Sequence, residues 1–342
     1  MAKAQRTFGR TVCRPLLGYT RPSRRDFLSL FVALAGTSSA MAQQRSFRVG
    51  MLSLGQVSAD AFRQWGLPEL ASLGFADGRN LVFFDRSTEG DATRLQELAL
   101  EVLAERPDVV IAVSNPAAHA IRRADPSMRI VMGFAGTDPV SDGLVQSLAR
   151  PGGPVTGVVM LAEELDMKRI EVARELMPRA RIGFLAGTTF PDGRIARTLA
   201  AAQAMGIELL VERATGPETH GPALERLHRA GARAVVVASF PSFAGNAAAL
   251  GRWGRELGLP IVCEWAFMVE AGCLASYGPN NEALRRRTAQ IVARVLRGEN
   301  PGVVPMEQPS RFEFALNARI AREIGLDIPH SVLARADEVF EQ

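Results

Sequence analysis

Residues 108–133 read DVVIAVSNPAAHAIRRADPSMRIVMG, and this stretch decides the fold class. A largely apolar segment from Asp108 to Val113 precedes a segment of helical period over Ala117 to Arg123. A second largely apolar segment follows from Arg129 to Gly133. Strand, helix and strand in this order form a βαβ unit, in which the two strands are parallel. The stretch therefore predicts an α/β fold.

The same alternation continues on both sides of this unit. Further strands are predicted at 48–52, 80–84, 181–186, 207–212, 234–238, 261–263, 274–276 and 312–315, and helices at 60–73, 92–105, 163–177, 193–205, 222–230, 244–257 and 282–296. A chain of 342 residues is long enough for about two domains. The strong breaker Pro151-Gly-Gly-Pro154 is interpreted as a crossing between them. We therefore expect two Rossmann-like lobes with parallel sheets.

The formal charge of +4 comes from the N-terminus. Residues 1–42 contain seven Lys or Arg and one acidic residue, which leaves 33 basic and 35 acidic residues in the rest of the chain. The remainder carries no basic footprint for nucleic acid, so no nucleic-acid partner is expected.

Residues 1–42 have the order of parts of an export signal. A basic stretch leads into the apolar run from Phe27 to Gly36, and small residues follow up to Ala42. Ser23-Arg-Arg-Asp-Phe-Leu28 resembles a twin-arginine motif, with Sec export as the alternative. Ten apolar residues are too few to cross a bilayer. We expect cleavage near Ala42 and a soluble periplasmic product.

Two cysteines, Cys263 and Cys273, remain after the expected cleavage. Both lie in short apolar runs, where an unpaired cysteine behaves as a small hydrophobic residue. Buried thiols are the favoured interpretation, and a disulfide formed in an oxidising compartment is the alternative.

Motifs for common enzyme chemistry are missing from the sequence. It has neither a G-x-G-x-x-G turn nor a phosphate-binding P-loop, and no G-x-S-x-G elbow. The four histidines are scattered without the spacing of metal ligands. No enzymatic activity, cofactor or metal is therefore predicted.

Small polar residues follow several of the predicted strands. The carboxyl ends of parallel strands are where open α/β sheets bind ligands, and helices that begin there offer free N–H groups to a carboxylate. Helix capping is the competing interpretation for each single residue. The candidate ligand-binding residues at these positions are Ser53, Gly55, Ser114, Asn115, Thr137, Asp138, Thr188 and Thr189.

Aromatic and acidic residues gather at other strand ends, from Phe240 to Tyr277. Rings at such positions can stack on a ligand, and a carboxylate can pair with an ammonium group. Packing inside the protein is the alternative. The candidate residues of this second group are Phe240, Glu264, Trp265 and Tyr277, with Phe243 and Phe267 beside them.

A set of short motifs resembles one family of transport proteins. The motifs are Phe75-Ala-Asp-Gly-Arg-Asn-Leu81, Asp138-Pro-Val140, Gly143-Leu-Val145, Ser147-Leu-Ala-Arg-Pro-Gly-Gly153, Thr156-Gly157, Ser276-Tyr-Gly-Pro279 and Ser331-Val-Leu-Ala-Arg-Ala-Asp337. In order and spacing they look like the ABC transporter substrate-binding proteins, the type that includes tryptophan and tyrosine binders. The resemblance covers residues 47–340.

The resemblance implies a type I periplasmic binding fold with a ligand cleft between two lobes. The first lobe is then expected at 47–155 plus about 272–308, and the second at 156–270 plus about 309–342. The family's ligand-contacting loops correspond to the polar residues named above together with Ser239 and Tyr277. The implied partners are a small-molecule ligand and the membrane permease and ATPase of an ABC importer, with the chain itself a monomer.

The function that follows is capture of a small carboxylate-bearing molecule, such as an amino acid, by hinge closure. Ser114-Asn115-Pro116 replaces a more usual Gly-Thr-Pro, and Gly187-Thr-Thr-Phe190 replaces an Asn-Pro turn, so the ligand can differ from an aromatic amino acid. The alternatives are a ligand-sensing subunit of a signalling system and an α/β enzyme.

Overall fold

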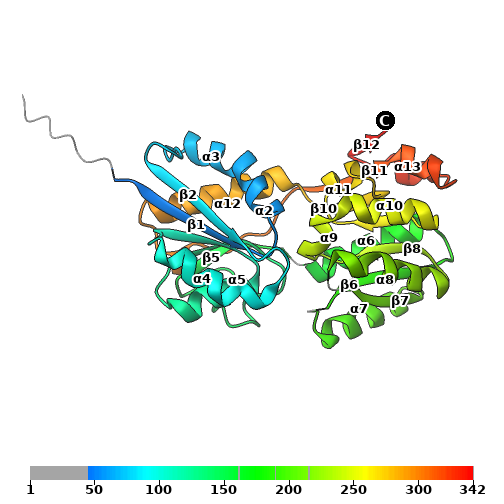
Figure 1. Ribbon diagram of the computed structural model, residues 1–342, viewed down its shortest axis with the longest axis horizontal. Coiled ribbons are helices and arrows are strands. Elements are labelled where there is room, and N and C mark those ends of the chain that lie inside the picture. Colours follow the sequence, from blue (N-terminus) through cyan, green and yellow to red (C-terminus); the bar gives the residue numbers. More distant parts are fainter. Residues whose placement is uncertain (1–44, 161, 189, 215, 342) are drawn as a thin grey trace, which may run out of the picture. The chain divides into compact units, whose positions relative to one another are not determined.

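The predicted alternation of strands and helices produces two separate sheets (Figure 1). The computed structural model describes residues 45–341 except 161, 189 and 215. The expected export signal, with its cleavage site near Ala42, lies outside the described residues. Within the described part of the chain, no helix is both long enough and apolar enough to cross a membrane.

The first sheet is parallel throughout, with strand order β2-β1-β3-β4-β5. Its strands are β1 (Phe47–Ser53), β2 (Leu81–Ser87), β3 (Val109–Val113), β4 (Ile130–Ala135) and β5 (Val155–Val159). The segments that connect them are α2 (Val57–Ala61), the π-helical η1 (Phe62–Gly66), α3 (Leu67–Ser72), the 3₁₀ turn η2 (Ala92–Arg94), α4 (Leu95–Ala104) and α5 (Asn115–Ala124). All five residues of β3 are buried, as expected for a strand covered on both faces.

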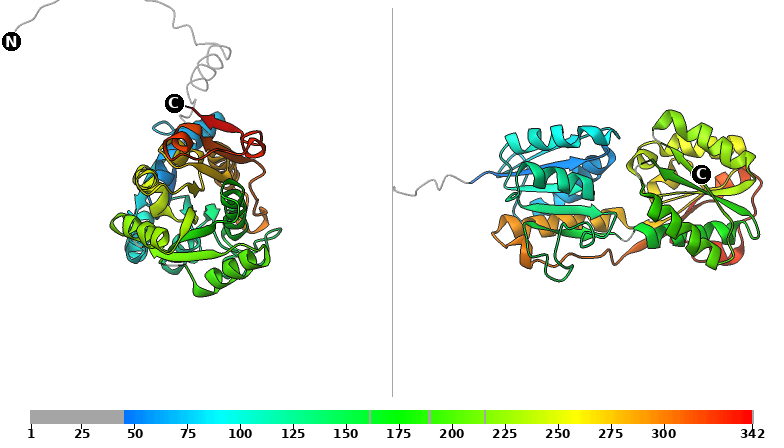
Figure 2. Two further views of the ribbon diagram at one scale, coloured as in Figure 1. Left: turned by 90° about the vertical axis from the view of Figure 1, so that its right-hand side faces the viewer. Right: turned by 90° about the horizontal axis from the view of Figure 1, so that it is seen from below.

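The second sheet has the order β12-β11-β10-β9-β8-β6-β7 and is parallel except for the β10–β11 pair. Its strands are β6 (Arg181–Gly187), β7 (Leu209–Ala214), β8 (Ala232–Val237), β9 (Ile261–Cys263), β10 (Ala275–Pro279), β11 (Phe312–Asn317) and β12 (Glu338–Phe340). Its helices are α6 (Ala162–Leu176), α7 (Asp192–Ala204), α8 (Pro217–Arg229), α9 (Pro241–Gly245), α10 (Ala247–Leu257), α11 (Ala266–Glu270), α13 (Ala318–Glu323) and α14 (His330–Leu333). Figure 2 shows helices on both faces of this sheet.

The long helix α12 (Asn281–Leu296) joins the first sheet although it follows a strand of the second. The Thr288 hydroxyl donates to the carbonyl of Gly133 in β4, and Arg129 donates to the carbonyl of Val295. The segment after α12, which includes the 3₁₀ turn η3 (Pro301–Val303), runs beside β5, where Glu307 exchanges backbone hydrogen bonds with Gly157 and Val159. The chain therefore passes between the sheets after β5, after β10 and before β11.

These pairings differ from the lobe boundaries expected from the sequence. Strand β5 belongs to the first sheet, so the first crossing follows Val159 and not the Pro-Gly-Gly-Pro segment. Strand β10 pairs with β9 and β11 in the second sheet, so the second crossing lies between Pro279 and Asn281. We therefore propose lobes of 47–159 with 281–307, and of 162–279 with 312–340.

The helix expected over 60–73 is present as three consecutive segments, α2, η1 and α3. Proline has no backbone N–H, so Pro68 cannot donate to the carbonyl four residues earlier. A π-helical turn is a common adjustment at such a break. Gly66 fits here because the ring of Phe62 occupies the space that a Cβ atom would need.

Cys263 and Cys273 are buried and free in the structure. Burial raises the pKa of the Cys263 thiol well above its usual value, with the neighbouring Cys273 adding to the effect. The interpretation of these residues as buried thiols is therefore confirmed by their placement.

Candidate functional site

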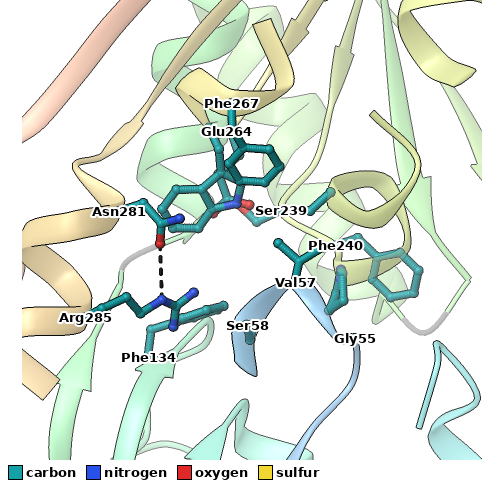
Figure 3. Close-up of a pocket in the computed structure, with 13 residues that line it drawn as sticks. Gly55, Val57, Ser58, Phe134, Ser239, Phe240, Glu264, Phe267, Asn281 and Arg285 are labelled. Atoms are coloured by element: carbon teal, nitrogen blue, oxygen red, sulfur yellow. Dashed lines mark hydrogen bonds between the residues drawn. The ribbon is translucent and has the colours of Figure 1, made fainter. Parts of the chain in front are cut away.

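A cavity lies where the carboxyl ends of strands from both sheets face each other, within residues 46–342, which form one compact unit (Figure 3). The volume inside it that is open to water-sized groups is about 50 Å³. The lining residues are Gly55, Val57, Ser58, Phe134, Ser239, Phe240, Pro241, Ala244, Glu264, Trp265, Phe267, Asn281 and Arg285.

Elements of the first lobe supply one wall of the cavity. Gly55 and Ser58 come from the turn and helix after β1, Phe134 from β4, and Asn281 and Arg285 from the first turns of α12. The Arg285 Nε atom donates to the Asn281 Oδ1 atom at 3.1 Å, and the guanidinium carbon lies 5.7 Å from the centre of the Phe134 ring. Figure 3 shows this guanidinium pointing toward the cavity.

Arg285 is a buried cation without an acidic partner in the described part of the chain. Its side chain is 3% exposed, and it forms no ion pair with a described carboxylate. Burial lowers its pKa from 12.5 to about 10, while nearby Glu264 raises it. The group stays charged at neutral pH, and a buried charge without a partner is costly.

Elements of the second lobe supply the opposite wall. Ser239 and Phe240 follow β8, and Glu264 and Trp265 follow β9. The Trp265 ring lies 6.5 Å from the Phe267 ring and nearly parallel to it, and 6.3 Å from the Phe134 ring of the other wall. These spacings are typical of interacting aromatic rings, so the three rings form an apolar part of the cavity lining.

Glu264 brings a carboxylate into the cavity under strong desolvation. It is 6% exposed, and its Oε1 atom has no hydrogen-bond partner among the described residues. Burial raises the pKa of this carboxyl group, and Arg169 and a hydrogen bond with Ser239 act in the opposite direction. An acceptor buried without a donor is rare in proteins and calls for an explanation.

A buried ion network supports this wall from behind. Asp166 on α6 pairs with Arg169 at 2.5 Å and with Arg194 on α7 at 2.5 Å, and all three side chains are almost completely buried. Arg169 also donates to the Ser239 hydroxyl at 2.8 Å and to the Tyr277 carbonyl at 3.0 Å. The network thus fixes the turn after β8.

Comparison with known proteins gives the family. The profile of the family described as "ABC transporter substrate binding protein" matches residues 57–340. The chain belongs to this family. A curated relative, the "Tyrosine-binding protein" of Clostridioides difficile (strain R20291), is 26% identical over 270 residues, which are 76% of this chain and 75% of the relative.

Solved structures agree with a type I periplasmic binding fold for this substrate-binding protein. A conserved domain protein from Vibrio cholerae O1 biovar eltor aligns with a TM-score of 0.79, 24% identity, 86% of this chain and all of that chain. An ABC domain from Streptococcus pneumoniae, solved in complex with L-Trp, aligns with a TM-score of 0.76, 24% identity and the same coverage. The predicted fold class and family are therefore confirmed.

Five of the candidate residues predicted from the sequence line the cavity of this substrate-binding protein. They are Gly55, Ser239, Phe240, Glu264 and Trp265. All five follow strands β1, β8 and β9, whose carboxyl ends meet at the cavity. Phe267 of the predicted aromatic group also lines it, whereas Phe243 is buried behind Phe240 at 5.5 Å between ring centres.

Three other candidates have mainly intramolecular partners near the ends of β1 and β3. Ser53 is buried and donates to the Gly55 carbonyl. Ser114 caps α5 by accepting from the Ala117 N–H, with an unusual φ of 146°. Asn115 donates to Asp142 at 2.5 Å, and its buried Oδ1 atom has no partner among the described residues.

Thr137 and Asp138 line a separate depression that also contains Glu163, Arg194 and Arg197. Thr137 donates to Asp142, and Asp138 accepts from the Val140 N–H in its own turn. These residues therefore lie near the first crossing, and the structure does not place them on the walls of the aromatic cavity.

The last candidates lie on the second lobe and are not among the residues that line the aromatic cavity. The carbonyl of exposed Thr188 accepts from Arg213, and Thr189 is outside the described residues. Tyr277 stacks on Phe312 with 6.1 Å between ring centres and lines another hollow beside Lys168.

Sequence reasoning missed four polar or aromatic residues of the cavity: Ser58, Phe134, Asn281 and Arg285. Phe134 directly follows the predicted strand 129–133, so the strand-end argument could have included it. The described residues contain no group of three or more His, Cys, Asp or Glu side chains arranged to hold a metal.

Proposed function

We propose that this chain is the solute-binding component of an ABC importer, and that it captures a small molecule with a carboxylate, such as an amino acid. Buried Arg285 carries the proposal, because its guanidinium faces an aromatic cavity and forms no ion pair with a carboxylate of the described residues. A ligand carboxylate would complete the hydrogen bonds of this cation, and a planar fork of donors matches it well.

The relatives support an amino-acid ligand. One is named for binding tyrosine, and another was solved with L-Trp bound. The rings of Phe134, Trp265 and Phe267 give this cavity the surface that an aromatic side chain needs. Aromatic amino acids are therefore the first ligands to test.

Residues from both lobes line the cavity, and this supports a binding cycle in which the lobes close on the ligand. Delivery then requires a membrane permease and its ATPase, with which substrate-binding proteins of this family work. The leader with Arg24-Arg25 supports export to the periplasm and cleavage near Ala42.

Calorimetry on residues 43–342 with the common amino acids, their keto acids and aromatic acids tests the binding function. A ligand at about 100 times its Kd should add about 2.7 kcal/mol to the free energy of unfolding, which raises the melting temperature by several degrees. A flat thermal response and no binding heat across these three classes would refute the proposal.

A further inference from the structure

Two charged side chains of the cavity retain hydrogen-bonding capacity that no described residue uses. Arg285 donates one N–H to Asn281 and forms no ion pair in the described part of the chain. Glu264 leaves its buried Oε1 atom without a donor. Arg285 therefore lacks a negatively charged acceptor, and Glu264 lacks a hydrogen-bond donor. A ligand that carries both an anionic and a cationic group supplies what the two side chains lack.

The two groups belong to opposite walls. Arg285 lies on α12, which is fastened to the first sheet through Thr288 and Gly133. Glu264 directly follows β9 of the second sheet. Figure 3 shows Arg285 and Phe134 on one side of the cavity, and Glu264 and Phe267 on the other. A ligand that contacts both groups therefore contacts both lobes.

The network behind Glu264 already has its own excess of positive charge. Asp166 faces two guanidinium groups, those of Arg169 and Arg194, and Arg169 also attracts the Glu264 carboxylate. Burial raises the pKa of the Glu264 carboxyl group, and the attraction to Arg169 partly opposes that rise. An ionised carboxylate with a free oxygen is an acceptor for a cationic donor.

We propose that Arg285 binds the carboxylate of the ligand and Glu264 binds its ammonium group, so that the cavity selects zwitterionic amino acids over acids or amines with the same ring. This assignment rests on the proposed binding function and specifies which groups perform it. Because the two charges of the ligand are held by different lobes, the complete zwitterion links the lobes and a molecule with one charge does not.

The expected discrimination follows from the strength of charge-assisted hydrogen bonds. A hydrogen bond to a charged group changes an equilibrium constant by about 10- to 150-fold. Removal of either charge from the ligand leaves one buried protein group unpaired, so each loss should weaken binding by about this factor.

Matched ligands separate the two charges in a calorimetric titration of residues 43–342. L-tryptophan is compared with indole-3-propionate, which lacks the ammonium group, and with tryptamine, which lacks the carboxylate. The corresponding sets for L-tyrosine and L-phenylalanine accommodate a smaller ring. The wild-type protein should bind one of the amino acids about 10- to 150-fold more tightly than either of its analogues.

Two variants assign the charges to their partners. Arg285→Gln should bind the amino acid no better than the amine, and Glu264→Gln should bind it no better than the acid. Arg286→Gln and Glu270→Gln are the matched controls, because Arg286 pairs with Glu69 and Glu282 away from the cavity and Glu270 is exposed on α11. Arg285→Lys replaces Arg285→Gln if the latter does not fold, since it keeps the charge but loses the planar fork.

The outcomes separate the anchor assignment from the binding function. If the wild-type protein binds an amino acid and both cavity variants bind it as the controls do, the assignment is overturned and the binding function stands. Equal affinity of the wild-type protein for the amino acid and its deaminated acid overturns the role of Glu264. If no ligand of the three sets and no other amino acid or carboxylic acid binds, the proposed function itself fails, and the assignment fails with it.

Discussion

Replacement of Asp166 by asparagine should strongly destabilise the second lobe. Asp166 accepts from Arg169 and from Arg194, each at 2.5 Å, and the exposure of the three side chains does not exceed 6%. Asparagine has nearly the same shape but no charge, so Asp166→Asn leaves Arg169 without an ion pair and leaves Arg194 with only Glu163, 4.0 Å away. Breaking a buried ion pair by removal of one partner costs about 3–5 kcal/mol. The free energy of unfolding should fall by that amount.

Urea-induced unfolding of residues 43–342, followed by circular dichroism, measures this loss. Glu171→Gln on the same helix is the control, because Glu171 pairs with exposed Lys168 at 2.8 Å and its own side chain is 35% exposed. A surface pair of this kind contributes about 0–1 kcal/mol. The two variants thus remove one carboxylate each from α6 and differ in burial.

A second variant tests whether like charge is the cause. Arg194→Met keeps the Asp166–Arg169 pair intact, and the double variant Asp166→Asn, Arg194→Met removes the repulsion between the two guanidinium groups. The double variant should therefore be less destabilised than the sum of the single variants. A loss below 1 kcal/mol for Asp166→Asn, or strict additivity in the double variant, would refute the reasoning.

Three further predictions concern other buried groups. Glu264→Gln should raise the melting temperature of the ligand-free protein at pH 7, because burial raises the pKa of Glu264 and so disfavours its charged form; no change in the melting temperature would contradict this. Burial lowers the pKa of His220 to about 4, so the fold favours its neutral form, and stability should decrease by up to about 3 kcal/mol as the pH falls from 6.5 toward 4. Urea titrations at pH 7 and pH 4.5 should show a smaller decrease for His220→Gln than for the wild-type protein. Gly278→Ala should weaken ligand binding and lower stability by about 1–3 kcal/mol, because its Cβ would overlap the Glu264 carbonyl oxygen, whereas Gly153→Ala has open space and should change neither.

The order of strands and helices could be predicted because each buried strand is a continuous apolar run. The residues Val109 to Val113 are all buried, and such a run is readable without a structure. Strand β5 was not predicted. It contains Gly157 at a φ of 133° and directly follows Pro-Gly-Gly-Pro, so its local sequence is typical of a turn. Pairing with Met132 and its neighbours in β4 makes it a strand, and that contact is not local.

The cavity could be predicted in part, for a related reason. Glu264 and Trp265 were found because they follow a strand, and strand ends are local features. Arg285 was missed because it is the first of three consecutive arginines on a helix, where charged residues usually face solvent. Its spacing from Thr288 and Val292 places it on the buried face of α12, so helical periodicity could have marked it as a buried cation.

The connection after β10 explains how the two proposed anchors stay in register. Gly278 lies against the backbone of Glu264, and Asn280 caps α12 by accepting from the Ala283 N–H at 2.6 Å. The next residue, Asn281, holds the Nε atom of Arg285. One short segment thus touches Glu264 at its beginning and positions Arg285 at its end. This segment is one of the three connections between the lobes. A change in the angle between the lobes should therefore change the distance between Glu264 and Arg285. A ligand of fixed charge separation would then favour one lobe arrangement over the others.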